Sequence, residues 1–308
     1  MKVAVIGAGN VGASLVQRIA EAGLADVVVV DIVEGVPQGK ALDLTQAAPI
    51  VGHDCRVAGT SSYAEIQGSD LVVITAGMPR KPGMSRLDLL KVNADIVGGV
   101  ASEVKQRCPH ALVIVVTNPL DVMTHHAQRV TGFEPERVIG MAGVLDSARL
   151  RAFIALELEV SVNDVQAMVL GGHGDSMVPL PRFSTVSGIG IELLMSQEAI
   201  DRIVDRTRKA GTEIVALLKT GSAYYAPAAA AFQMVEAVLK DRKRILPACV
   251  KCTGQYGING IYVGVPIKLG AKGVEQIIEL PLTADELASL RKSAEEVEQA
   301  IKDLEAGL

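Results

Sequence analysis

The chain has 308 residues, of which 49% are hydrophobic and 21% charged, and its formal net charge is −5. This length can bury one large or two ordinary domains without disulfide staples. The slightly acidic balance argues against a nucleic-acid groove or an acidic lipid surface, since both need clustered Lys and Arg. The absence of Trp also disfavours the stacking of bases on aromatic rings. We therefore expect neither a nucleic-acid nor a membrane partner.

The four cysteines are few for this length, which favours a reducing compartment and a cytoplasmic protein. Cys249 and Cys252 form a C-x-x-C, but residues 244–253 are predicted as a strand, where positions three apart face opposite sides. With no second pair or histidine at metal spacing, a structural role is favoured over a zinc or redox site. The apolar start at residues 3–6 is soon interrupted by polar residues, so we expect no secretion signal.

The first half alternates short β-branched runs with helical stretches. A continuous apolar run at residues 2–6, followed by glycines, is typical of a buried parallel strand. A helix is predicted over residues 11–22, and a second strand over 27–30 ends at Asp31. Further strands are predicted at residues 56–58, 71–75, 112–116 and 138–141. This alternation predicts an α/β fold with a doubly wound parallel sheet covered on both faces.

The second half has a different pattern. A strand-like run at residues 165–170 leads into two glycines, helices are predicted over 197–218 and 226–239, and residues 244–280 carry strands interrupted by Gly and Pro. Thr283 and Glu286 have the spacing of a capping box at the start of a terminal helix. We place the boundary between two domains, 1–143 and 144–308, where the pattern changes.

A glycine motif follows the first strand and opens the first helix. It consists of Gly7, Ala8, Gly9, Asn10, Val11 and Gly12, which read G-x-G-x-x-G. Gly7 would permit the tight turn, Gly9 the approach of a pyrophosphate, and Gly12 close packing of helix on strand. The helix N-terminus would supply free N–H groups to the phosphates. The alternative is a plain turn, but the context favours a Rossmann dinucleotide site.

Asp31, at the end of the next strand, is expected to accept hydrogen bonds from the adenosine ribose. The following residues, Ile32, Val33 and Glu34, offer no cation that would absorb the 2′-phosphate of NADP. The sequence therefore predicts NAD as the cofactor.

Only one of the five histidines stands in a glycine-rich turn after a buried strand: His173, in the sequence GGHGD. Histidine is the usual proton carrier near neutral pH, although a single histidine is more often structural. His125 and His126 are predicted on a helix, and we interpret them as packing or surface residues.

Residues 76–86 form a Gly- and Pro-rich loop that carries Arg80, Lys81 and Arg86 after a strand. Ligands bind at the carboxyl ends of parallel strands in this architecture, so the cations are candidates for substrate binding; a solvated basic loop is the alternative. Further polar candidates are Asn118, Asp146 and Arg149.

Taken together, these motifs resemble the lactate/malate dehydrogenase family, and within it the lactate-dehydrogenase-like malate dehydrogenases of bacteria. The resemblance runs essentially from end to end. It is carried by GAGNVG, ITAGMPRKPGMSR, VTNPLD, GVLDSAR, GGHGD and GSAYYAP, in the family's order. It implies a Rossmann domain followed by a mixed α/β substrate domain, and a homo-oligomer that is a dimer or a tetramer.

The resemblance also implies the roles of individual residues. His173 would be the acid/base at the C2 oxygen of the substrate, with Asp146 orienting its imidazole. Arg86 would polarise the carbonyl, and Arg149 would bind the C1 carboxylate with two parallel hydrogen bonds. The remaining implied contacts are Asn118 to the substrate, and Asn93, Val116 and Asn118 beside the cofactor.

Arg80 would determine the substrate. The family has arginine here in malate dehydrogenases and typically glutamine in lactate dehydrogenases. An arginine can pair with the second carboxylate of oxaloacetate, whereas it would face the methyl group of pyruvate without a partner. The resemblance thus implies reversible NAD-dependent oxidation of (S)-malate to oxaloacetate.

Three alternatives stay open. Ala223 stands where lactate dehydrogenases usually carry Thr, which supports malate but leaves side activity on other 2-keto acids, and a lactate or broad 2-hydroxy acid dehydrogenase is the rival enzyme. A Rossmann protein that senses NAD without turnover would not need Arg80, Arg86, Arg149 and His173 together. A structural protein that merely keeps the fold would need none of them. No metal is expected, because the arginines and His173 supply charge stabilisation and proton transfer.

Overall fold

The structure is a computed structural model that describes residues 1–79 and 86–307, without the side chain of Arg86. The α-helices are α1 (Asn10–Glu21), α2 (Val36–Val51), α3 (Arg86–Arg107), α4 (Leu120–Thr131), α5 (Gly143–Leu158), α6 (Gln197–Leu218), α7 (Tyr225–Leu239) and α8 (Ala284–Gly307). The strands of the main sheet are β1 (Lys2–Ile6), β2 (Asp26–Val30), β3 (Val57–Thr60), β4 (Leu71–Ile74), β5 (Leu112–Val115), β6 (Val138–Gly140), β12 (Arg244–Thr253), β13 (Asn259–Gly270) and β14 (Gly273–Ile277). Short strands elsewhere are β7 (Val165–Gln166), β8 (Val169–Leu170), β9 (Val178–Pro179), β10 (Thr185–Val186) and β11 (Ile189–Gly190).

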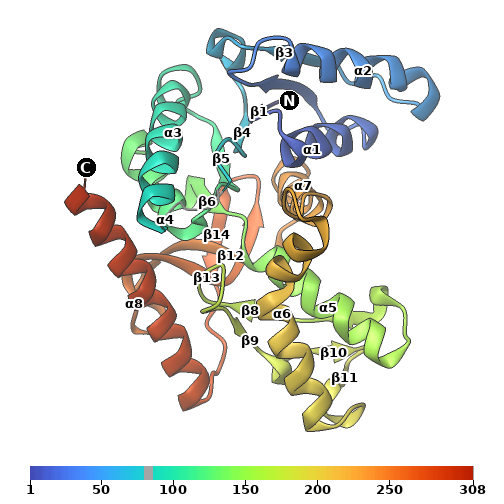
Figure 1. Ribbon diagram of the computed structural model, residues 1–308, viewed down its shortest axis with the longest axis vertical. Coiled ribbons are helices and arrows are strands. Elements are labelled where there is room, and N and C mark those ends of the chain that lie inside the picture. The colour runs from blue at the N-terminus through green and yellow to red at the C-terminus, as the bar shows by residue number, and fades with distance from the viewer. Residues whose placement is uncertain (80–85, 308) are drawn as a thin grey trace.

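The first six strands form a parallel sheet in the order β3-β2-β1-β4-β5-β6. Successive side chains of a strand point to opposite faces, and here both faces are buried. Val3 and Val5 pack into one core with α1 and α7, whereas Ala4 and Ile6 pack into a second core with α3 and α4. These helix pairs lie on opposite sides of the sheet (Figure 1). The predicted doubly wound parallel sheet is confirmed.

The second half of the chain extends this sheet. Strands β12, β13 and β14 are antiparallel, and β12 joins β6 through the pairing of Cys249 with Gly140. A Cβ at Gly140 would lie 2.5 Å from Thr124 Oγ1 and 2.8 Å from Cys249 Cβ, so only glycine allows this approach. The sequence predicts strands in this region but not their continuity with the parallel sheet, since the junction depends on one distant pair.

The strand predicted over residues 165–170 is wrong as a single element. Val165 and Gln166 pair with β10 in a three-stranded sheet, whereas Val169 and Leu170 pair with β9 in another. A short apolar run carries no information about a change of hydrogen-bonding partner along its length.

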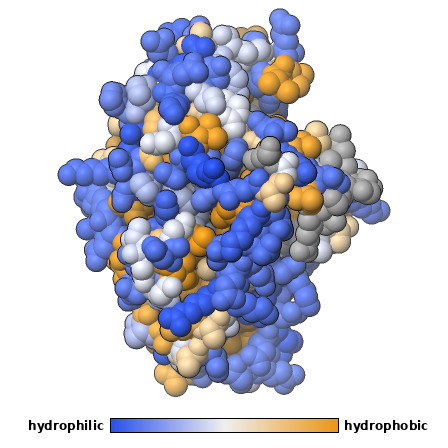
Figure 2. Space-filling model, turned by 90° about the vertical axis from the view of Figure 1, so that its left-hand side faces the viewer, coloured by the Kyte–Doolittle hydropathy of each residue, from blue (hydrophilic) through white to orange (hydrophobic). Residues whose placement is uncertain are grey.

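The terminal helix α8 begins as predicted. Thr283 N–H donates to Glu286 at 2.8 Å, and Glu286 N–H donates to Thr283 Oγ1 at 3.2 Å, which completes the capping box. The helix buries one side, including Leu290 and Val297, and the molecular face that carries it is mostly hydrophilic (Figure 2). Within residues 1–79 and 86–307, no helix combines the length and hydropathy that crossing a membrane requires.

The two cysteines of the C-x-x-C lie on opposite faces of β12, as their spacing predicts. Cys249 packs with Leu120, Ala142 and Tyr262, whereas Cys252 belongs to the core that contains α7. Both thiols are buried and free. The pair therefore cannot chelate one ion without rebuilding the strand.

Candidate active site

The glycine motif turns from β1 into α1. Gly7 has φ +107°, and a Cβ there would lie 2.7 Å from Thr75 Oγ1, so the turn requires glycine. A Cβ at Gly12 would overlap the carbonyl oxygen of Gly7 at 1.9 Å, which shows how closely helix and strand pack. A Cβ at Gly9 would meet nothing within 4 Å, and no described side chain caps the N-terminus of α1. The open flank and the free N–H groups fit a pyrophosphate.

Asp31 lies directly beside this loop. One carboxylate oxygen accepts the Ala8 N–H at 2.7 Å, and the other accepts the Val33 N–H at 3.0 Å. The ammonium group of Lys40, on α2, donates to the Ala8 carbonyl at 2.6 Å. Sequence reasoning did not predict this contact of Lys40, because a helical lysine nine residues after Asp31 carries no local signal of its position.

Replacing Asp31 by Ser is expected to raise the ratio of NADPH to NADH efficiency by roughly 10- to 100-fold, since the change removes a charge that repels the 2′-phosphate. Steady-state kcat/KM for both cofactors measures this ratio. Glu34→Ser is the matched control, because Glu34 is an exposed acid on the same loop. An unchanged ratio in Asp31→Ser, or an equal change in both variants, would contradict the role of Asp31.

His173 and Asp146 meet from two different elements. Asp146 lies in the first turn of α5, and His173 follows β8 and two glycines. His173 Nδ1 is 2.9 Å from Asp146 Oδ2, and the exposed fractions of the two side chains are 16% and 2%. The carboxylate thus accepts a hydrogen bond from Nδ1–H and leaves Nε2 for a reacting group.

Burial alone would lower the pKa of His173, but the charge of Asp146 and its hydrogen bond outweigh burial, so the pKa is raised above its usual value. Arg149 opposes this change and Asp121 reinforces it. A raised pKa keeps a larger fraction of the imidazole protonated near neutral pH, as a proton donor requires.

Arg149 stands one helical turn after Asp146, so both side chains share a face of α5. Its Nη1 is 3.2 Å from Asp146 Oδ1, and its exposed fraction is 12%. The Nε atom is buried and has no hydrogen-bond partner among the described residues. A guanidinium with an unused buried donor beside a buried histidine suits the carboxylate of a small acid.

The other predicted residues gather at the carboxyl ends of β4 and β5. Val116 is half-buried just after β5, and Asn118 is exposed two residues further on. Asn93 is buried, and its amide bonds to both main-chain groups of Met78 and to the carbonyl of Asn118. Asn93 therefore ties the start of the loop to the end of β5, and its contact with the cofactor stays a prediction. Arg80 and the side chain of Arg86 lie outside the described residues.

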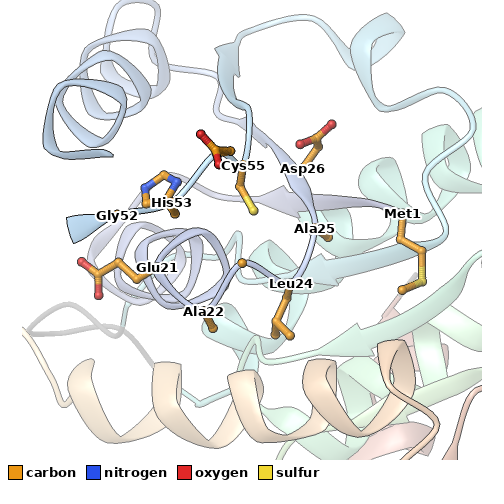
Figure 3. A pocket seen from close by; sticks show the side chains of 11 residues that line it. Met1, Glu21, Ala22, Leu24, Ala25, Asp26, Gly52, His53 and Cys55 are labelled. Atoms are coloured by element: carbon orange, nitrogen blue, oxygen red, sulfur yellow. The ribbon is translucent and has the colours of Figure 1, made fainter. Parts of the chain in front are cut away.

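A pocket of about 570 Å³ lies elsewhere. It surrounds Met1, Glu21, Asp26, His53 and Cys55, near the amino ends of β1 and β2 (Figure 3). Ligands of doubly wound sheets bind at the carboxyl ends instead, where the residues described above converge. The size of this pocket therefore does not identify the active site.

Comparisons with known proteins agree with this geometry. Residues 1–140 match the family model for the lactate/malate dehydrogenase NAD binding domain, and residues 143–307 match that for the alpha/beta C-terminal domain. The chain is 58% identical to malate dehydrogenase from Roseiflexus sp. (strain RS-1), over 99% of each sequence.

Solved structures give the same result. Malate dehydrogenase from Salinibacter ruber superposes with a TM-score of 0.96 at 53% identity, covering 99% of this chain and 98% of that one. Lactate dehydrogenase from Cryptosporidium parvum, complexed with lactic acid and nicotinamide adenine dinucleotide, gives 0.95 at 49% identity, covering 99% and 98%.

A Rossmann glycine turn with an acid at the end of the neighbouring strand, together with a buried His–Asp pair, defines an NAD-dependent dehydrogenase. The chain belongs to the lactate/malate dehydrogenase family.

Proposed function

We propose that the substrate pair is (S)-malate and oxaloacetate, interconverted with NAD. The observation that carries the chemistry is the contact between His173 Nδ1 and Asp146, with Arg149 beside them. The choice of a dicarboxylate is supported by the relatives, which are named malate dehydrogenases, and by the arginine at position 80.

In malate oxidation, neutral His173 accepts the hydroxyl proton through Nε2, and Asp146 stabilises the imidazolium that forms. Bound NAD would accept the hydride from C2. In the reverse direction, protonated His173 donates to the carbonyl oxygen, and Arg86 would stabilise the negative charge that develops there. Arg149 holds the C1 carboxylate, and Arg80 would hold the second one. These residues supply charge stabilisation and proton transfer between them.

Oxaloacetate-dependent oxidation of NADH, followed by absorbance, tests this proposal. Turnover that saturates in both compounds is expected. A protein that bound NADH without consuming it would be a sensor and would contradict the proposal.

We further propose a division of labour between residues 1–143, which bind NAD, and residues 144–308, which bind the substrate. Support comes from the glycine loop and Asp31 in the first part, and from Arg149 and His173 in the second. The four free cysteines support a cytoplasmic location.

We also propose that the protein is a homo-oligomer, either a dimer or a tetramer. Helix α2 carries the exposed apolar side chains of Leu42 and Ile50, and Val51 follows at its end. Such side chains on one helix favour burial against another copy.

Light scattering is expected to give two or four times the chain mass of 32.3 kDa. Replacing Leu42 and Ile50 together by Glu is expected to shift the mass towards the monomer, because charge would be buried at the contact. A monomeric wild-type protein would contradict oligomerisation, whereas an unchanged mass in the double variant would exclude α2 from the interface.

A further inference from the structure

The loop that contains His173, residues 171–173, is held by contacts with four other elements. Gly171 exchanges two main-chain hydrogen bonds with Gly264 of β13, at 2.8 and 3.1 Å. The Gly172 N–H donates to Ser293 Oγ of α8 at 2.8 Å, and the His173 N–H donates to Asp121 Oδ2 of α4 at 2.8 Å. The carboxylate of Asp146, on α5, bonds to Nδ1 of the His173 ring. His173 is therefore bound by two carboxylates, one at the ring and one at the main chain.

Glycine at position 172 makes this arrangement possible. A Cβ there would lie 3.3 Å from Ser293 Oγ, 3.3 Å from Val297 Cγ2 and 3.4 Å from Asp121 Oδ2. The two acceptors thus converge on consecutive N–H groups where a side chain would crowd both. These two hydrogen bonds therefore fix the position and the orientation of the His173 main chain relative to the sheet.

The surroundings of Asp121 make its charge significant. The side chain is 5% exposed, its Oδ1 has no hydrogen-bond partner among the described residues, and no described cation pairs with it. Burial raises the pKa of Asp121, the His173 N–H and the Cys249 thiol oppose this rise, and the charge of His173 also lowers it. The carboxylate and the imidazolium therefore stabilise each other in a medium of low dielectric constant.

We propose that Asp121 is a positioning residue of the proton-transfer site, whose carboxylate fixes the main chain of His173 and whose charge favours the protonated imidazole. Among the described residues, the charged groups that act on His173 are then Asp146 and Arg149 from α5 and Asp121 from α4. From β12, Cys249 faces Asp121 as a thiol, because burial raises its pKa. From α8, the neutral hydroxyl of Ser293 accepts the Gly172 N–H, and from β13 the main chain of Gly264 bonds to Gly171. This inference rests on the proposed proton transfer by His173 but not on which hydroxy acid is the substrate.

Two variants separate charge from geometry. Asp121→Asn keeps an oxygen that can accept the His173 N–H but removes the charge, whereas Ser293→Ala removes the neighbouring acceptor without changing any charge. In Asp121→Asn, the apparent pKa of the falling limb of kcat/KM for oxaloacetate reduction should move down by about one pH unit. In Ser293→Ala, kcat should fall several-fold, whereas this apparent pKa should not change. Asp121→Ala should lower kcat further than Asp121→Asn, since it removes both functions.

The imidazole signal of His173, followed by NMR titration of the protein without substrate, gives the same pKa independently of turnover. His173→Asn identifies the signal. A lowered pKa in Asp121→Asn but not in Ser293→Ala supports the proposal, even if oxaloacetate proves to be the wrong substrate. An unchanged pKa in Asp121→Asn, or equal changes in both variants, overturns it. These two variants decide the question even if Asp121→Ala does not fold.

Discussion

His173→Asn is expected to lower kcat for oxaloacetate reduction by roughly 10²- to 10⁴-fold, because asparagine cannot exchange a proton near neutral pH. Asparagine retains an N–H that can donate to Asp146, so the packing around the carboxylate changes little. Steady-state rates with NADH measure the loss. The control is His110→Asn, which alters an exposed histidine and should retain wild-type turnover. More than a few per cent of activity in His173→Asn would show that another group carries the proton.

The wild-type pH dependence follows from the raised pKa of His173. Reduction needs the protonated imidazole, so kcat/KM for oxaloacetate should be constant below that raised pKa and fall as the pH rises through it. Oxidation needs the neutral imidazole, so kcat/KM for malate should rise over the same interval. A kcat/KM that falls with rising pH in both reaction directions, or rises in both, would be inconsistent with His173 as the single acid/base.

Arg80→Gln is expected to lower kcat/KM for oxaloacetate by roughly 10²- to 10³-fold and to improve pyruvate relative to it. The reason is the loss of the proposed ion pair between Arg80 and the second carboxylate, since removing one partner of an enclosed pair costs about 3–5 kcal/mol. Pyruvate lacks the second carboxylate, so a neutral glutamine removes the cost of an unpaired guanidinium. The ratio of the two kcat/KM values, measured at one NADH concentration, gives the effect.

Lys81→Gln serves as the control for this prediction, because it removes the same charge from the same loop without the implied substrate contact. A change in the substrate ratio in Lys81→Gln as large as that in Arg80→Gln would indicate a general electrostatic effect of the loop. The specific pairing of Arg80 with the distal carboxylate would then be wrong.

Local patterns predicted much of the fold. The strand β1, the glycine turn and α1 lie within 21 residues, and their spacing carries the physical requirements of the turn. Alternation of strands and helices predicted the parallel sheet, because burial on both faces demands continuous apolar strands. The break between β7 and β8 and the joining of β12 to β6 escaped prediction, since both depend on which distant strand supplies the hydrogen bonds.

The residues of the candidate site, like the elements of the fold, could be predicted from the sequence only in part. His173 and Asp146 were predicted from motifs and family resemblance, and the structure places their side chains in contact. Lys40, Ser293 and Asp121 were not predicted as supports of the site. Their partners lie 32, 121 and 52 positions away in the chain, and nothing in their own neighbourhoods marks those contacts. The groups proposed to do the chemistry lie in recognisable motifs, whereas the contacts that hold them are seen only in the three-dimensional structure.

The preference for a dicarboxylate is tested most directly by the initial rates of the unmodified protein with oxaloacetate and pyruvate, each at low concentration with NADH or NADPH. We expect oxaloacetate with NADH to be fastest by a wide margin, because Arg80 would pair with the distal carboxylate, and Asp31 would accept hydrogen bonds from an unphosphorylated ribose but repel a 2′-phosphate. Faster reduction of pyruvate than of oxaloacetate at equal concentration would contradict the assignment.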